Sequence, residues 1–151
     1  IQPSPWYAPR FLLPILGMLV GNALSGVSLV LDSITSAAHR ERNVIEARLA
    51  LGSPRFVAFE DSLRRAMRTG MMPVLNAMAA AGIVSLPGMM TGQILAGIDP
   101  VEAAKYQILI MFLIAGSTAL AVLAAGIGAV HFLTDERHRL RLDNTTGAAA
   151  N

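Results

Sequence analysis

The sequence predicts an all-α, polytopic membrane protein, and three observations lead to this fold class. Hydrophobic residues make up 54% of the 151 residues, charged residues only 15%, and the mean hydropathy is +0.53. A soluble domain contains about 25% charged residues, so this chain has too little polar surface to cover a water-soluble globule. The charged residues also leave three long apolar segments between them. We therefore expect about three transmembrane helices, with the middle one broken near Pro87.

The first apolar segment, Phe11 to Leu31, predicts a membrane helix over residues 11–38. A helix needs about 20 mainly apolar residues to cross the hydrocarbon core, and this segment is long enough. Gly17 and Gly21 lie one helical turn apart, a spacing that allows close helix packing in lipid.

Polar residues gather on one face of this first helix, at helical spacing. They are Asn22, Ser25, Gly26, Asp32, Ser33 and Ser36. The face must meet protein or water. Interhelical hydrogen bonding is the first interpretation. A solute pathway, in which Asn22 and Ser25 would touch the cargo, is the second.

Residues 40–68 predict a charged elbow between the first two spans. Residues 44–51 form a short helical stretch that Gly52 closes, since glycine suits a C-terminal cap. Ser53 as cap and Pro54 at the first helical position then start an amphipathic helix at the membrane surface. A loop held to the membrane by its positive charge is the alternative, but it would need no such ordered turn.

The middle segment, residues 70–98, predicts a broken membrane helix. A continuous helix of this length would exceed a hydrocarbon core of about 30 Å, and Pro87 interrupts it. Backbone groups freed at membrane depth must be buried in protein or face a wet cavity. The break therefore supplies pathway candidates: Leu86, Pro87, Gly88, Met89, Met90 and Thr91. A packed proline kink without function remains the alternative.

Five of the eight methionines lie in this middle segment: Met71, Met72, Met78, Met89 and Met90. Thioethers are soft ligands that suit Cu(I) or ferrous iron, but methionine also fills gaps where a helix bends. We favour packing, so no metal ligand is assigned. Gly88 and Gly92 form a second pair of small residues that allows helix packing.

The remaining segments are an external loop at residues 99–105, a membrane helix at 106–133 and a tail at 134–151. The elbow contains seven arginines: Arg40, Arg42, Arg48, Arg55, Arg64, Arg65 and Arg68. Short basic loops stay on the cytoplasmic side. We therefore expect the N-terminus outside, the C-terminus inside, and a multi-pass protein of the plasma (inner) membrane.

Several function classes are disfavoured. The net charge of +2 does not suggest nucleic-acid binding, and the absence of cysteine removes thiolate catalysis and cysteine metal sites. No Gly-x-x-x-x-Gly-Lys-Ser/Thr motif is present, so we expect no bound nucleotide or other cofactor. The first residue is not methionine, and we expect the C-terminal portion of a longer protein.

The elbow and the broken helix resemble a known family. Glu46-Ala47, then Gly52, and later Ile83-Val84-Ser85-Leu86-Pro87 resemble the EAA loop of ABC importer permeases. The segment from Ile83 to Gly92, with 96–100 and 105–108, is more similar to the FetB-like permeases, which are linked to iron export and have plant relatives linked to aluminium tolerance. Arg48 stands where the general pattern has alanine.

This resemblance implies a permease subunit that exports a metal, with iron as the cargo, in a permease homodimer driven by a separate ATP-binding subunit. The residues that would couple to that subunit are Glu46, Ala47, Arg48, Gly52, Ser53 and Pro54. The resemblance implies no catalytic residue in this chain.

A scaffold subunit and an intramembrane serine hydrolase are the alternatives. A scaffold subunit without a pathway of its own would need no docking elbow. An intramembrane serine hydrolase would need a histidine base near Ser25, but His131 is expected at the opposite end of the membrane from the N-terminal half of that helix.

Overall fold

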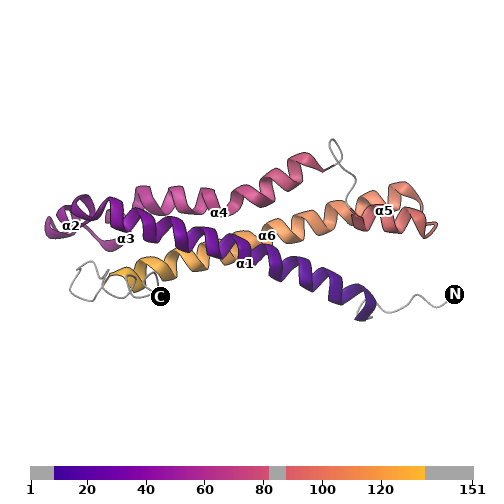
Figure 1. Ribbon diagram of the computed structural model, residues 1–151, viewed down its shortest axis with the longest axis horizontal. Coiled ribbons are helices and arrows are strands. Elements are labelled where there is room, and N and C mark those ends of the chain that lie inside the picture. Colours follow the sequence, from indigo (N-terminus) through magenta and orange to yellow (C-terminus); the bar gives the residue numbers. More distant parts are fainter. Residues whose placement is uncertain (1–8, 82–87, 135–151) are drawn as a thin grey trace, which may run out of the picture.

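Two long helices that run in the same direction frame the fold (Figure 1). They are α1, Pro9–Arg40, and α6, Pro100–Leu133, in a computed structural model that describes residues 9–81 and 88–134. Within those residues, these are the two helices long and apolar enough to cross a membrane. Each measures about 50 Å at 1.5 Å per residue, which exceeds a hydrocarbon core of about 30 Å. The fold is all-α, as predicted.

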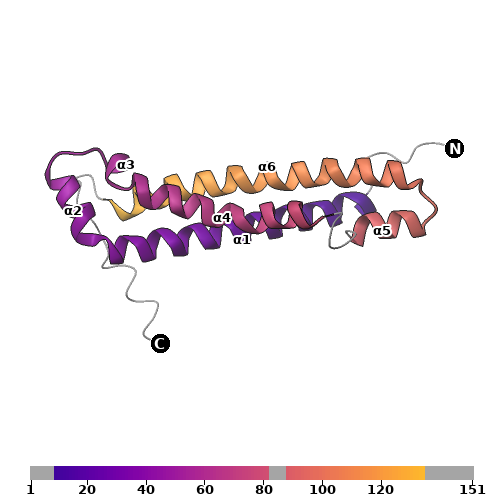
Figure 2. The ribbon, with the colours of Figure 1, turned by 90° about the horizontal axis from the view of Figure 1, so that it is seen from above.

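The middle region runs the opposite way along this frame. It consists of α4, Glu60–Ala80, followed by α5, Gly88–Leu95, which continues toward the far end beside α6 (Figure 2). The backbone turns extended at Ala81, where α4 ends. The middle helical region is therefore interrupted, as predicted, although Leu86 and Pro87 themselves lie outside the described residues.

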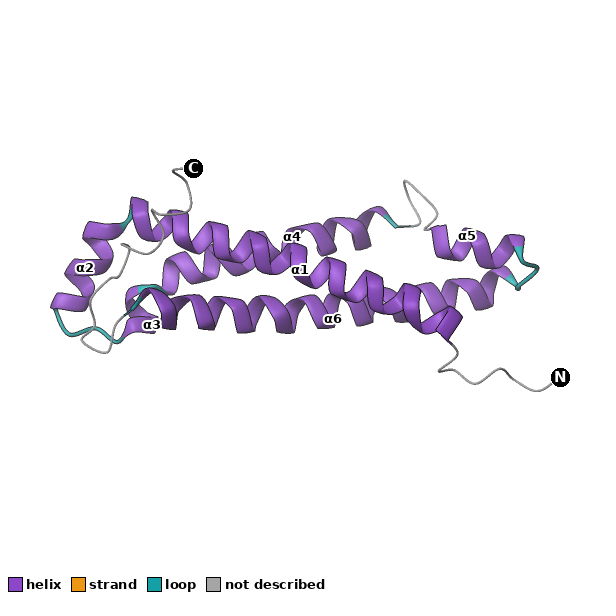
Figure 3. Ribbon diagram, turned by 60° about the horizontal axis from the view of Figure 1, so that its bottom comes forward, coloured by secondary structure: helices purple, strands orange, loops and turns teal. Residues whose placement is uncertain are grey.

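Two short helices form the elbow at the end of the bundle where α1 and α6 terminate. They are α2, Arg42–Ala50, and α3, Arg55–Ala58 (Figure 3). The predicted amphipathic helix starts one residue later than expected, at Arg55 rather than Pro54, and it is divided at Phe59. Its second part is the first half of α4. This part packs into the bundle rather than lying on the membrane surface, because Ser62 and Ala66 are buried.

Helix α6 begins at Pro100 rather than at Tyr106, so most of the predicted loop at 99–105 is helical. The carboxylate of Asp99 caps it by accepting hydrogen bonds from the backbone N–H groups of Val101 and Glu102. Proline at the first helical position completes a strong start signal. The turn before it is closed by Gly97 at φ +86.

The packed core lies in the elbow half of the bundle. Val30, Ile34, Phe59, Val122 and Val130 are all buried there. Toward the other end, large apolar side chains of the long helices are exposed, including Leu13 at 68% and Phe112 at 66%. A bilayer or further protein would cover such surface without cost, whereas water would not.

Candidate functional site

The elbow is an ordered turn rather than a loose loop. Gly52 has φ +85, a backbone conformation that favours glycine. Its N–H donates to the Leu49 carbonyl, and the N–H of Ser53 donates to the Arg48 carbonyl. These two bonds form the Schellman motif, which satisfies the last carbonyls of α2. The predicted role of Gly52 as a helix cap is thus confirmed in its geometry.

Charged side chains tie the elbow to α4. Arg48 donates through both terminal nitrogens to Asp61 Oδ2 at 3.2 Å. The hydroxyl of Ser62 donates to Glu41 Oε2 at 2.8 Å, and Arg65 donates to the other oxygen of Glu41. Each exposed ion pair contributes only about 0–1 kcal/mol, but together they join the α1–α2 junction and α2 to α4. Arg48, the departure from the general EAA pattern, therefore makes a contact that alanine could not.

Apolar contacts seat the same elbow on the bundle. Ile45 and Leu49 of α2 are buried with Phe59 in the common core. The ring of Phe56 meets the ring of His131 edge to face, with centroids 5.3 Å apart. Because His131 lies near the end of α6, α3 is linked directly to the second long helix.

The elbow presents an outer surface that no described residue covers. Its large apolar residues are exposed, with Leu51 at 86%, Val44 at 53% and Val57 at 50%. Ala47 and Pro54 are also exposed, and Ser53 is half-buried. Glu46 is half-exposed and accepts a hydrogen bond from Arg42 at 2.8 Å within its own helix. The predicted coupling residues thus fall into two groups: Arg48 and Gly52 hold the elbow together, whereas Glu46, Ala47 and Pro54 contribute to its surface.

The predicted pathway residues of α1 bond to their own helix. Asn22 Nδ2 donates to the Met18 carbonyl at 2.8 Å, and Ser25 Oγ donates to the Gly21 carbonyl at 2.9 Å. These bonds satisfy donors without another helix, so the interhelical hydrogen bonds expected for this stripe are not formed at Asn22 or Ser25 within the described residues.

The pathway candidates near the break are only partly described. Gly88 is exposed, and Met89, Met90 and Thr91 are half-buried in the first turn of α5. Among the methionines nearby, Met71 packs against the core, in keeping with a packing role, whereas Met72 is 46% exposed. No cluster of three or more His, Asp or Glu side chains that could hold a metal ion is found in residues 9–81 and 88–134.

Helix contact occurs at glycines other than the predicted ones. A Cβ on Gly17, Gly21, Gly88 or Gly92 would have no described neighbour within 4 Å. The close crossing instead involves Gly26 of α1, Gly70 of α4 and Gly126 of α6. A Cβ on Gly26 would lie 2.9 Å from Thr118 Cγ2, and one on Gly126 would lie 2.9 Å from Leu63 Cδ1. These single glycines have no partner at GxxxG spacing, so this sequence pattern does not reveal them.

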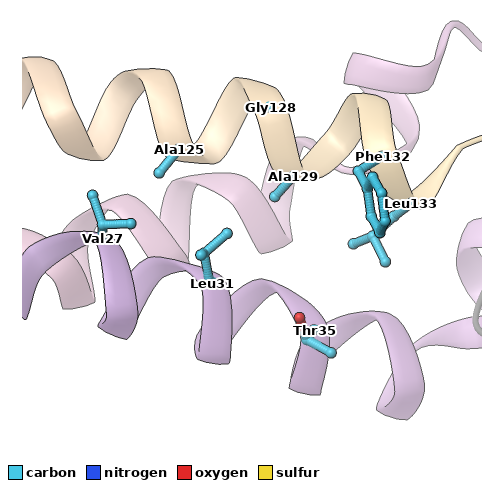
Figure 4. A pocket seen from close by; sticks show the side chains of 8 residues that line it. All are labelled: Val27, Leu31, Thr35, Ala125, Gly128, Ala129, Phe132 and Leu133. Atoms are coloured by element: carbon cyan, nitrogen blue, oxygen red, sulfur yellow. The ribbon is translucent and has the colours of Figure 1, made fainter. Parts of the chain in front are cut away.

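Sequence reasoning also missed an apolar groove of about 500 Å³ between α1 and α6 (Figure 4). Val27, Leu31 and Thr35 form one wall, and Ala125, Gly128, Ala129, Phe132 and Leu133 form the other. The groove is open and lacks charged groups. The side of α1 that lines this groove is therefore mostly apolar, and it differs from the side that carries the polar stripe.

The serine hydrolase hypothesis fails on geometry. Gly26, next to Ser25, lies at the level of Thr118 and Val122 of α6. His131 follows Val122 by nine residues, which places it about 13 Å farther along the helix. A serine and its base must lie within hydrogen-bond reach, so this pair cannot form a catalytic dyad.

Comparison with known proteins extends the resemblance. Residues 1–133 match the family described as Uncharacterised protein family (UPF0014). The chain is 44% identical over 124 residues to UPF0014 membrane protein slr1647 of Synechocystis, covering 82% of this chain and 48% of that protein. It is 34% identical over 134 residues to the probable iron export permease protein FetB of Escherichia coli, covering 89% and 52%.

A plant protein is similar as well. Protein ALUMINUM SENSITIVE 3 of Arabidopsis thaliana is 35% identical over 115 residues, covering 76% of this chain and 42% of that protein. The chain spans about half the length of the curated relatives it matches. No solved structure matches it significantly. The family match over most of the chain, together with two helices able to cross a bilayer, shows that this chain belongs to the UPF0014 family of membrane proteins.

Proposed function

We propose that this chain is part of the permease subunit of an ABC transporter that exports a metal ion, with iron as the cargo. A separate ATP-binding subunit would supply the energy, and two permease subunits would form a homodimer in the plasma membrane. The elbow carries the proposal, because it is an ordered, braced structure at one end of the bundle. The relative named as a probable iron export permease supports the choice of cargo.

The elbow has the properties that a docking element needs. Its outer surface combines the exposed Leu51 and Val44 with the acidic Glu46, and such a mixed surface fits a groove on a partner. Its inner side is fixed to α4 by the Arg48–Asp61 pair and to α6 by the Phe56–His131 contact. A movement of the partner would therefore be passed on to helices that run the length of the bundle. A scaffold subunit would gain nothing from this linkage.

Docking is tested by co-purifying the full-length permease with its ATP-binding subunit. We expect Glu46→Arg and Gly52→Pro to lose the complex, because the first reverses the exposed acid and the second removes the N–H that closes the turn. Glu102→Arg is the matched control, since Glu102 is also an exposed acid paired within its helix, but lies at the other end of the bundle. If both elbow variants retain the complex and its ATP-driven transport, the coupling role is wrong.

Cargo is tested in vesicles that contain the complete complex. ATP-dependent movement of Fe²⁺ is compared with that of other metal ions, and the sign of the movement gives the direction of transport. If the ATP-dependent signal were the same in vesicles with Fe²⁺ and in vesicles without it, the iron assignment would be wrong.

A further inference from the structure

The polar stripe of α1 includes a carboxylate, Asp32, toward the elbow end of the helix. Ser25, Asp32 and Ser36 lie seven and four residues apart, so they share one face of the helix, and all three are exposed. Asp32 lies eight residues before the end of α1 at Arg40, about 12 Å along the helix. It forms no hydrogen bond or ion pair with any described residue. This carboxylate therefore stands in an apolar helix without a partner in residues 9–81 and 88–134.

A second line of polar residues follows α4 on the adjoining side. Arg65, Thr69 and Asn76 lie four and seven residues apart, which also places them on one helix face, and all are exposed. Arg65 contacts Glu41 at the end of α1, so this face of α4 is turned toward α1. Gly26 and Gly70 bring the two backbones together between the lines.

Helix α6 occupies the other side of both helices. It meets α4 at Leu63, through Gly126, and it meets α1 along the apolar groove at Val27 and Leu31. Helix α1 contacts α4 through Gly26 and Val30. Seen down the helix axis, the groove residues lie to one side of this contact and the polar stripe lies to the other. The two polar lines therefore border the same open side of the α1–α4 pair.

Lipid is a poor neighbour for this side. Charged side chains on a membrane helix usually face water or protein rather than lipid. Hydroxyl, amide and carboxylate oxygens are hard ligands, which suit hydrated divalent cations better than soft monovalent Cu(I). The guanidinium of Arg65 lies on this side too, where the carboxylate of Glu41 pairs with its charge. The methionines do not extend this chemistry, because Met71 packs into the core on another face of α4.

We propose that the open side of the α1–α4 pair lines a water-filled pathway for a hydrated divalent cation, and that Asp32 attracts and selects this cation near the elbow end. The inference rests on the proposed transport function and gives it a substrate class. It also replaces the broken middle helix with α1 and α4 as the principal lining of the pathway.

The first experiment measures ATP-dependent flux of Fe²⁺, Mn²⁺ and Cu⁺ in vesicles that contain the complete transporter. We expect Asp32→Asn to lower Fe²⁺ and Mn²⁺ flux by about tenfold, equivalent to about 1.4 kcal/mol, and Asp32→Glu to restore most of it. Thr35→Ala, one turn away in the apolar groove, should leave flux unchanged. Co-purification with the ATP-binding subunit should be the same for all variants.

Equal divalent flux in Asp32→Asn and wild type would overturn the role of Asp32 while leaving the transport function intact. The same conclusion would follow if Asp32→Asn and Thr35→Ala lowered flux equally. If the wild type moves no cation with ATP, the proposed function itself fails.

The second experiment does not depend on transport. Because this chain contains no cysteine, Ser25→Cys, Ser36→Cys and Asn76→Cys each introduce its only thiol. We expect a water-soluble thiol reagent to label them much faster than Leu24→Cys and Leu120→Cys, which are exposed on apolar surface. Labelling of the three polar positions at the rate of these two controls would overturn the water-filled pathway.

Discussion

At the scale of single residues, Gly70 is the position where the helices approach most closely. A Cβ there would lie 2.9 Å from the carbonyl oxygen of Gly26 and would collide with Val30, and backbone cannot yield as a flexible side chain can. We expect Gly70→Ala to destabilise the bundle by about 1–3 kcal/mol, as overpacking usually does. Thermal unfolding of the purified protein in detergent measures the effect. Gly17→Ala is the control, since its Cβ would have no neighbour within 4 Å among the described residues, and equal stability of the two variants would contradict the crossing.

The residues that determine this crossing could not be predicted from spacing. Gly17 and Gly21 follow a known packing pattern, yet Gly26, Gly70 and Gly126 make the contacts, each as a single glycine on a separate helix. A motif within one helix shows which face of that helix carries small side chains. It does not reveal the register between helices, which depends on how all of them pack. Gly52 was predictable, because its role is local and follows directly from the end of α2.

At the scale of elements, the ion pair between α2 and α4 should matter more for coupling than for stability. Arg48 and Asp61 are substantially exposed, so breaking the pair should cost no more than about 1 kcal/mol. We expect Arg48→Asp or Asp61→Arg alone to lower ATP-dependent transport, because the elbow would then be held less firmly against α4. The double swap should restore transport, while the thermal midpoint changes little in all three. A swap no more active than the single variants would show that the pair does not transmit movement.

Helix boundaries can be predicted where the sequence contains a local start or stop signal. They are harder to predict where charged residues lie on the surface of a helix, because charge also indicates a loop. The Asp99-Pro100 cap of α6 is a strong start signal in the sequence. The charges of Glu102 and Lys105 nevertheless predict a loop up to residue 105, whereas in the structure the two side chains pair on the surface of α6. The amphipathic pattern from Phe56 to Met67 correctly indicated a helix with an apolar face. It could not reveal that this face packs into the bundle, since a membrane surface and a protein core favour the same pattern.

At the scale of the whole molecule, the distribution of charge predicted two long apolar helices, a middle helical region between them and the elbow that connects the first helix to this region. The ends of α1 and α6 and the whole elbow lie together at one end, and the turn between α5 and α6 lies at the other (Figures 1 and 2). Charge gaps reveal this order because a bilayer excludes charged residues from spanning segments. They carry no information about side chains that meet across helices, so the groove and the α1–α4 polar side emerged only from the structure.

The arginines predict the orientation of this molecule in the membrane, because seven of them lie between His39 and Arg68. Such a loop stays in the cytoplasm, so the elbow end should be inside and the Ala96–Asp99 turn outside. In intact cells, an impermeant thiol reagent should label Ala96→Cys but not Ser53→Cys, and inside-out vesicles should reverse the pattern. Both positions adjoin a glycine of positive φ, and because Ser53 is half-buried whereas Ala96 is exposed, the inside-out vesicles also show that Ser53→Cys can react. Labelling of Ser53→Cys from outside would place the elbow on the wrong face for an ATP-binding subunit, and the proposed coupling would fail with it.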